Sequence, residues 1–361
     1  MFEYALRLHQ LLAMKDYDQC LPLLQEYRDY LERRLAKNPR DLDAGCQLAD
    51  IYLELREPFE MSQEVLHRLV DEGGLDDHAM ARVYTDLAYF DCEDLRTGVV
   101  SGADMDRGRA YLEKAVALSP DTPYSYSALG DLELGEGHDQ RALVLLRAAA
   151  RRGRQPVYWY NYAVSLTYNG QWKQAKAMLE KMERLGEGGR DIFYALAVCS
   201  HTLGDRGSAL HYLAMSYAAD PDPADDRANL YYACGEFARY VDAYDRVQWY
   251  PLASGLGPYF YCLKALGRLN DCADKFQEVM GQQADMIKAC EQDTDPAWTD
   301  EDRQARLNDL RKERKDVESV YDRVVTEGVR PEAPLKCELT YVCYLADCVR
   351  HRDPEELRAT L

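Results

Sequence analysis

Three cysteines and a histidine lie close together near the end of the sequence, a combination that could bind zinc. They are Cys337, Cys343, Cys348 and His351, and thiolate and imidazole are ligands that Zn²⁺ prefers. The apolar residues around them predict a helix over 335–349. On a helix, Cys348 and His351 share a face, whereas Cys343 and Cys348 are five residues apart and diverge. The spacing therefore favours buried core thiols over a metal site, and we expect neither a metal nor a cofactor.

The cysteines as a whole indicate a reducing compartment. The chain has 11 of them, an odd number, with no Cys-x-x-Cys pair. A secreted disulfide framework usually shows regular pairs in a short chain. The first residues also lack a basic stretch followed by an apolar core, which is the mark of a secretory signal. We therefore expect free thiols and a cytoplasmic protein.

The sequence lacks the short motifs that identify common classes of enzyme. Gly186-x-Gly188-Gly189 is the closest approach to a phosphate-binding loop, but no Lys-Ser/Thr follows it. There is no His-Glu-x-x-His and no Gly-x-Ser-x-Gly, and the seven histidines are dispersed. We therefore predict that the protein is not an enzyme.

The charge of the chain is strongly negative and unevenly distributed. The chain has 63 acidic and 44 basic residues, a formal net charge of −19, and residues 1–120 contain 24 acids against 14 bases. An anionic surface repels nucleic acids and anionic membranes, and no apolar run approaches the roughly 18 residues of a membrane span. We expect a basic or neutral protein or peptide as partner, and neither nucleic acid nor membrane.

Short turns that contain glycine recur at a nearly constant interval. They lie at Gly137, Gly170, Gly204, Gly235 and Gly267, with spacings of 33, 34, 31 and 32 residues. Apolar residues on both sides of each turn recur at i, i+3, i+4 and i+7, the periodicity of amphipathic helices. The sequence therefore predicts an array of antiparallel helix pairs joined by these turns.

Each predicted pair carries small residues where its two helices must approach each other. The clearest copy contains Trp159-x2-Tyr162-Ala163, Gly170 and Ala175-x3-Leu179. This pattern resembles the tetratricopeptide repeat (TPR), a helix–turn–helix unit of about 34 residues. The resemblance implies an all-α fold, a right-handed superhelical array of helix pairs whose first helices line a concave surface.

We predict three parts along the chain. They are degenerate helix pairs over 1–76, a TPR-like array over 77–280 and a C-terminal part over 281–361. Glycine is missing from both turns of the first part, and an insertion around 95–106 predicts a long loop. In the last part, Thr299 is expected to cap a charged helix over 303–325, and the apolar helix over 335–349 completes a C-terminal helical cap of the array.

The repeat register places aromatic and polar side chains on the concave surface. Tyrosine stands out because the chain has 27, against seven Phe and four Trp, and a ring with a hydrogen-bonding tip suits recognition. The predicted partner-binding residues are Tyr124, Ser127, Asp131, Tyr160, Thr167, Tyr168, Asp191, Tyr194, His201, Asn229, Tyr232, Tyr261 and Lys264. TPR proteins that bind acidic chaperone tails carry a set of Lys, Arg and Asn on this surface. Only Asn161, Asn229 and Lys264 are of that type here, so we do not expect such clients.

Two classes of function are consistent with these features. The first is a non-catalytic protein-interaction scaffold that holds a peptide or protein segment on a Tyr-rich, mildly acidic concave surface. The alternative is an acidic inhibitor, such as an immunity protein, which neutralises a basic enzyme or toxin through acids of the first third such as Asp41, Asp43, Asp50 and Glu54. We favour the scaffold because the tyrosines follow the repeat register and the acids follow no comparable pattern.

Overall fold

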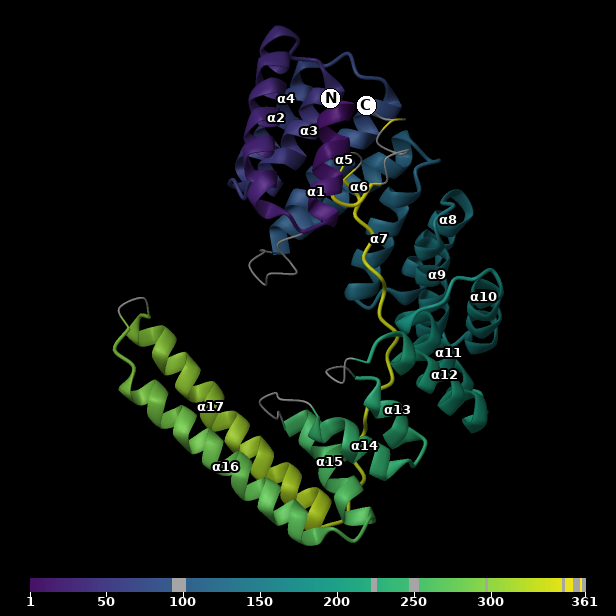
Figure 1. The fold of residues 1–361 in the computed structure, drawn as a ribbon, viewed down its shortest axis with the longest axis vertical. Helices are drawn as coiled ribbons and strands as arrows, with labels where there is room; N and C mark the ends of the chain where they lie inside the picture. The colour runs from purple at the N-terminus through teal and green to yellow at the C-terminus, as the bar shows by residue number, and fades with distance from the viewer. Residues whose placement is uncertain are drawn as a thin grey trace. The chain divides into compact units, whose positions relative to one another are not determined.

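The computed structural model describes residues 1–92, 102–221, 226–246, 253–295, 298–345, 348–352 and 358. Within these ranges the chain forms helices joined by turns and extended segments, with no β-strand (Figure 1). The predicted all-α class is therefore confirmed. None of the helices in the described ranges combines the length and the apolar character needed to span a membrane.

The chain divides into two compact units, which we describe separately. Unit 1 comprises Met1–Gln174 and Leu339–Leu361, and unit 2 comprises Ala175–Glu338. The residues 281–361, which we expected to form one C-terminal part, are thus shared between the units, and the division near residue 174 falls inside the predicted array.

Unit 1 is built from consecutive antiparallel helices. They are α1 (Phe2–Ala13), α2 (Tyr17–Lys37), α3 (Leu42–Glu54), α4 (Phe59–Glu72), α5 (Asp77–Cys92), α6 (Gly102–Leu118), α7 (Pro123–Gly135), α8 (Asp139–Arg152) and α9 (Pro156–Tyr168). The helix α10 (Trp172–Arg184) begins in unit 1 and continues into unit 2.

Unit 2 continues the same pairing and ends with two long helices. Its further helices are α11 (Arg190–Thr202), α12 (Arg206–Ala219), α13 (Ala228–Ala233), α14 (Phe237–Asp245), α15 (Ala253–Ala265), α16 (Leu269–Gln292) and α17 (Asp300–Tyr321), followed by a π-helical turn, η2 (Asp322–Thr326). Figure 1 shows α16 and α17 lying side by side along most of their length.

The predicted glycines lie in the turns that join the helices of each pair. All five have positive φ angles, between 69° and 84°, a conformation in which glycine avoids the steric cost of a Cβ atom. The turns after α1 and α3 adopt the same conformation at Lys15 and Arg56, with φ of 56° and 58°. The helix pairs of residues 1–76 therefore keep the turn geometry without the glycine, which explains their weak sequence signal.

The small residues of the repeat allow the paired helices to approach closely. A Cβ atom on Gly130 of α7 would lie 2.7 Å from Cγ of Leu146 on α8. The corresponding alanines that follow the turns, Ala142, Ala175 and Ala209, are all 0% exposed. Because protein interiors are packed at nearly crystalline density, these positions leave no room for a larger side chain.

The charged helix near the C-terminus begins as the sequence predicts. Thr299 forms a capping box with Asp302, in which each side chain bonds the main-chain amide of the other residue. At the other end of α17, the ring of Tyr321 stacks on that of Phe276 of α16 at 4.2 Å and meets that of Phe260 of α15 edge-on at 5.3 Å. The helix α17 thus packs against the last pair of unit 2.

The prediction of a helix over 335–349 is wrong. Residues 328–345 contain neither helix nor strand, and Leu335, Cys337 and Leu339 turn inward while Lys336 and Glu338 are exposed. This alternation is the signature of an extended chain packed on one side. Pro331 and Pro334 precede the segment, and its β-branched and aromatic residues disfavour a helix.

The predicted insertion around 95–106 falls partly on residues outside the described ranges. Residues 93–101 are among these, and 102–106 form the first turn and a half of α6 rather than a loop. The helix α6 therefore begins earlier than the repeat pattern indicates.

Candidate functional site

In unit 1 the side chain of Asn161 holds the main chain of Thr340. The Asn161 amide nitrogen donates to the Thr340 carbonyl at 2.8 Å, and its oxygen accepts from the Thr340 amide at 2.9 Å. Asn161 lies on α9, the first helix of its pair, and is only 3% exposed. Two hydrogen bonds to one residue's main chain hold an extended segment in place, whatever side chain that residue carries. We refer to residues 329–352 as the C-terminal segment; it is the yellow trace beyond α17 in Figure 1.

In unit 2 two of the predicted partner-binding residues hold the start of this segment. The Tyr232 hydroxyl donates to the Pro331 carbonyl at 2.7 Å, and Asn229 donates to the Pro334 carbonyl at 3.4 Å. Burial raises the pKa of Tyr232, so its hydroxyl keeps the proton that it donates. As at Asn161, the contacts are with main-chain carbonyls.

A cation of the segment lies among aromatic rings of unit 2. The Arg330 guanidinium is 4.9 Å from the ring centre of Tyr232 and 5.6 Å from that of Tyr261, and it donates to the Tyr232 carbonyl at 3.3 Å. Such cation–π contacts are typical of arginine over aromatic faces. Beside them, Lys264 donates to the carbonyls of Val324 and Val325 at the end of the π-helical turn.

The remainder of the segment packs onto the first helices of unit 1. The ring of Tyr344 meets Tyr89 of α5 edge-on at 5.2 Å, and the Val349 amide donates to the Asp50 carboxylate of α3 at 3.0 Å. Arg350 forms a two-pronged ion pair with Glu54, with contacts of 2.9 and 2.6 Å. Tyr344, Leu345 and Val349 are buried in the core of unit 1.

The predicted site residues differ in where the structure places them. Asn229, Tyr232, Tyr261 and Lys264 contact residues 324–334, and the ring of Tyr124 lies 5.2 Å from the Arg352 guanidinium. These five thus meet the chain's own C-terminal part, through its side chains or its main chain.

Other predicted residues serve their own helices or the core. The Thr167 hydroxyl donates to the Val164 carbonyl, and Asp191 pairs with Arg190. Buried positions include Ser127, Thr167, Tyr160 at 4% exposure and Tyr194 at 9%, whereas Asp131 and Tyr168 are exposed. His201 is half-buried with Nδ1 3.4 Å from the Cys234 sulfur, and burial lowers its pKa. The tyrosines predicted as accessible anchors are therefore mostly covered.

Asn161 is the residue that the sequence prediction left out of the site. Its type matched the asparagine of TPR proteins that bind acidic chaperone tails, but the missing basic pair counted against that client class. The signal that identifies it is its place on the first helix of a pair, on the same face as Ser165 one turn later. An asparagine there can bond any extended backbone, whatever the charge of the ligand.

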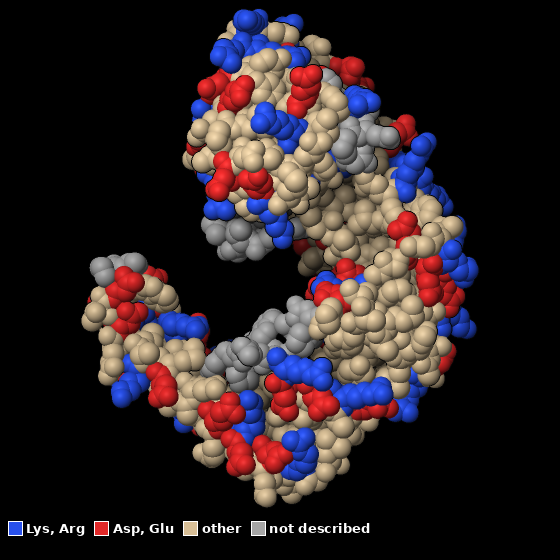
Figure 2. Space-filling view, viewed as in Figure 1, with Lys and Arg blue, Asp and Glu red and all other residues tan. Residues whose placement is uncertain are grey.

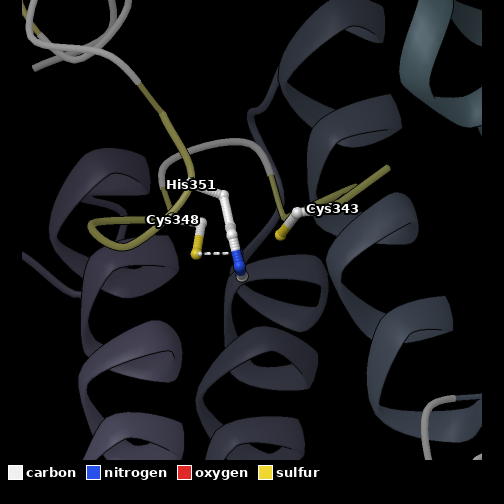
Figure 3. A group of neighbouring side chains, drawn as sticks. All are labelled: Cys343, Cys348 and His351. Carbon is white, nitrogen blue, oxygen red and sulfur yellow. Dashed lines mark hydrogen bonds between the residues drawn. The ribbon is translucent and has the colours of Figure 1, made fainter. Parts of the chain in front are cut away.

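Cys343, Cys348 and His351 come together where the segment turns, contrary to the divergence expected on a helix. Figure 3 shows their side chains directed toward one another, with a hydrogen bond between Cys348 and His351. A hydrogen bond from Cys348 also lowers the pKa of the Cys343 thiol. The helical argument fails because residues 339–345 are not helical and 349–351 form a turn. These three residues could hold a metal ion.

No family model and no curated protein matches the sequence. Among solved structures, the chain is similar to YrrB, described as a TPR protein with an unusual peptide-binding site (17% identity, 53% of this chain and 93% of that chain, TM-score 0.43). It is also similar to PilW, a type IV pilus biogenesis factor (21%, 60% and 94%, TM-score 0.44), and to PilF of Pseudomonas aeruginosa (19%, 55% and 90%, TM-score 0.43).

The assignment of the fold rests on the helix pairs themselves. Left-handed turns recur at the five glycines, and a fully buried alanine follows the turn in three successive pairs. With these features on consecutive antiparallel helices, the chain is a TPR-like helical-repeat protein.

Proposed function

We propose that the protein is a non-catalytic interaction scaffold that binds an extended segment of a partner protein on the first helices of its pairs. The observation that carries the proposal is the pair of hydrogen bonds between Asn161 and the main chain of Thr340. A side chain that bonds both polar groups of one residue's backbone can accept a different extended chain in the same position. In each unit, residues of the chain itself act as the ligand: Thr340 in unit 1, and residues 330–334 in unit 2.

The partner segment is expected to be basic or neutral. In the chain's own segment, Arg330 lies against Tyr232 and Tyr261, and Arg352 against Tyr124. These contacts favour a cation at the corresponding position of a competing peptide, because ring faces attract positive charge. In each unit the partner must also displace the chain's own residues, so its measured affinity is lowered by the cost of releasing them.

The alternative, an acidic inhibitor, has less support because four of its acids are paired or buried within unit 1. The ion pairs are Asp41–Arg34, Asp43–Arg82 and Glu54–Arg350. Asp50 is 1% exposed. Figure 2 also shows acidic and basic side chains intermixed on the visible surface of unit 1, not gathered in one acidic patch. Paired charges of this kind steer a distant basic partner weakly.

The experiment converts the C-terminal segment into a separate peptide. A protease site placed at the exposed Gly328 allows the folded chain to be cut after η2, and a labelled synthetic peptide of residues 329–361 then exchanges with the released fragment. Fluorescence anisotropy measures its dissociation constant. Unlabelled peptides of other sequences, with and without arginine, serve as competitors.

Asn161→Ala should raise the dissociation constant of the labelled peptide about tenfold or more. Losing two bonds to a half-buried main chain costs about 1–3 kcal/mol, and about 1.4 kcal/mol is a factor of ten. The matched control is Asn270→Ala, because Asn270 is exposed at the start of α16. Equal affinity in the two variants, or failure of every foreign peptide to compete, would contradict the proposed function.

A further inference from the structure

The turn at the end of the C-terminal segment gathers two thiols and an imidazole. The sulfurs of Cys343 and Cys348 and a ring nitrogen of His351 all lie within 4.8 Å of one another (Figure 3). Nδ1 of His351 is 3.3 Å from Sγ of Cys348. Both cysteines are buried, at 6% and 3% exposure, whereas His351 is exposed. A metal could therefore enter from the solvent side, past the imidazole.

These distances fit three of the four ligand positions of a tetrahedral zinc ion, and a water molecule would take the fourth on the exposed side. With Zn–S bonds of about 2.3 Å and Zn–N bonds of about 2.0 Å, neighbouring ligand atoms of a tetrahedron lie about 3.5–3.8 Å apart. The 3.3 Å contact is close to that range, and the 4.8 Å limit requires a movement of about 1 Å at most. Two soft thiolates with one imidazole select zinc over magnesium or calcium, which prefer oxygen ligands.

A buried carboxylate beside the cysteines provides an independent observation. Asp50 is 1% exposed; its Oδ2 accepts from the Val349 amide at 3.0 Å, and its Oδ1 is buried without a hydrogen-bond partner. The Asp50 carboxyl group also accepts a hydrogen bond from Cys348 and interacts electrostatically with Cys343. A buried polar oxygen without a partner is costly. A cation held by the two cysteines would interact favourably with the oxygens of this group.

We propose that Cys343, Cys348 and His351 bind one Zn²⁺ ion, which closes the turn that anchors the C-terminal segment to unit 1. All three ligands belong to the segment, so the ion fixes the turn itself. This turn positions Val349. The Val349 amide donates a hydrogen bond to Asp50 of α3, and the Val349 carbonyl lies 3.1 Å from Nδ1 of His9 of α1. The role is structural, because binding energy at such a site becomes folding energy of the turn.

The test measures metal binding by the full chain. The reduced protein is titrated with Zn²⁺ alone in competition with a chromophoric chelator, and with Co²⁺, whose absorption reports thiolate ligation and tetrahedral geometry. We expect one ion per chain. Removing a ligand with Cys343→Ser, Cys348→Ser or His351→Ala should weaken Zn²⁺ binding at least about 100-fold.

Two variants separate loss of zinc binding from loss of folding. His351 is exposed, so His351→Ala is expected to fold even if a buried cysteine variant does not. Cys290→Ser is the control, because Cys290 is a half-buried cysteine of α16, and it should bind Zn²⁺ as the unaltered chain does. Wild-type affinity in His351→Ala, a cobalt spectrum without thiolate bands, or a stable Cys343–Cys348 disulfide with no zinc uptake after reduction would overturn the proposal.

Discussion

Ala175→Glu is expected to destabilise the protein by about 4 kcal/mol or more. Ala175 is 0% exposed on α10, at the position where three successive pairs carry an alanine after the turn. A glutamate there must either carry a charge into the packed interior or displace the side chains around it. Thermal unfolding followed by circular dichroism measures the effect as a lowered midpoint or as loss of folded protein.

The neighbouring residue supplies the control for this prediction. Gln174→Glu introduces the same side chain one position earlier, where the residue is exposed, and should change the midpoint little. If both variants melted at the wild-type temperature, the repeat register, and with it the assignment of the small residues to the helix contacts, would be wrong.

Glu133→Ala should lower the free energy of unfolding by about 2–3 kcal/mol. Glu133 lies on α7 with a fully buried side chain, and it is bonded to Arg109 of α6 and to His138 after the turn, at 2.9 Å for the latter. Arg141 of α8 also lies within 3.4 Å. Removing the carboxylate takes away the one fully buried acceptor that Arg109, His138 and Arg141 share, so three consecutive elements lose their common contact, although Arg109 keeps Glu136 and Arg141 keeps Glu113.

A surface pair serves as the comparison for Glu133. Glu64 forms an ion pair with Arg68 one turn along α4, and both side chains are more than half exposed. Glu64→Ala should cost at most about 1 kcal/mol. Urea denaturation of both variants gives the two values. A loss at Glu133 no greater than that at Glu64 would mean that the buried network does not hold the helices together.

The paired helices could be predicted because their signals are local. A glycine such as Gly170 marks a turn through its own backbone conformation, and an alanine such as Ala175 marks a helix contact through its size. Thr299 marks the start of α17 because a hydroxyl followed three residues later by an acid caps a helix. None of these requires knowledge of distant residues.

The C-terminal segment could not be placed in this way. Its apolar run is compatible with a helix or with an extended chain, since short runs of this kind do not separate the two. Tertiary contacts decide between a helix and an extended chain. Thr340 contacts Asn161 across 179 residues, and Val349 contacts Asp50 across 299. The same contacts bring Cys343 to Cys348, which helical spacing keeps apart.

The cover over the tyrosines of unit 2 could not be predicted for a related reason. The repeat register predicts the face of the helix on which Tyr232 lies, but it does not predict that residues 331–334 cover that face. From the sequence alone, an open surface cannot be distinguished from a face that another part of the same chain covers. The pairing of Glu54 with Arg350 escaped prediction for the same reason.

Hydrogen exchange at the Thr340 amide tests the central claim, that α9 holds an extended backbone through Asn161. Residues 328–345 have no regular secondary structure, so protection of this amide must come from its bond to the Asn161 side chain. We predict exchange about 100-fold or more slower than in an unstructured peptide, and loss of that protection in Asn161→Ala while the amides within α9 stay protected. Exchange at the unstructured rate in the wild-type chain, or equal protection in the variant, would contradict the account.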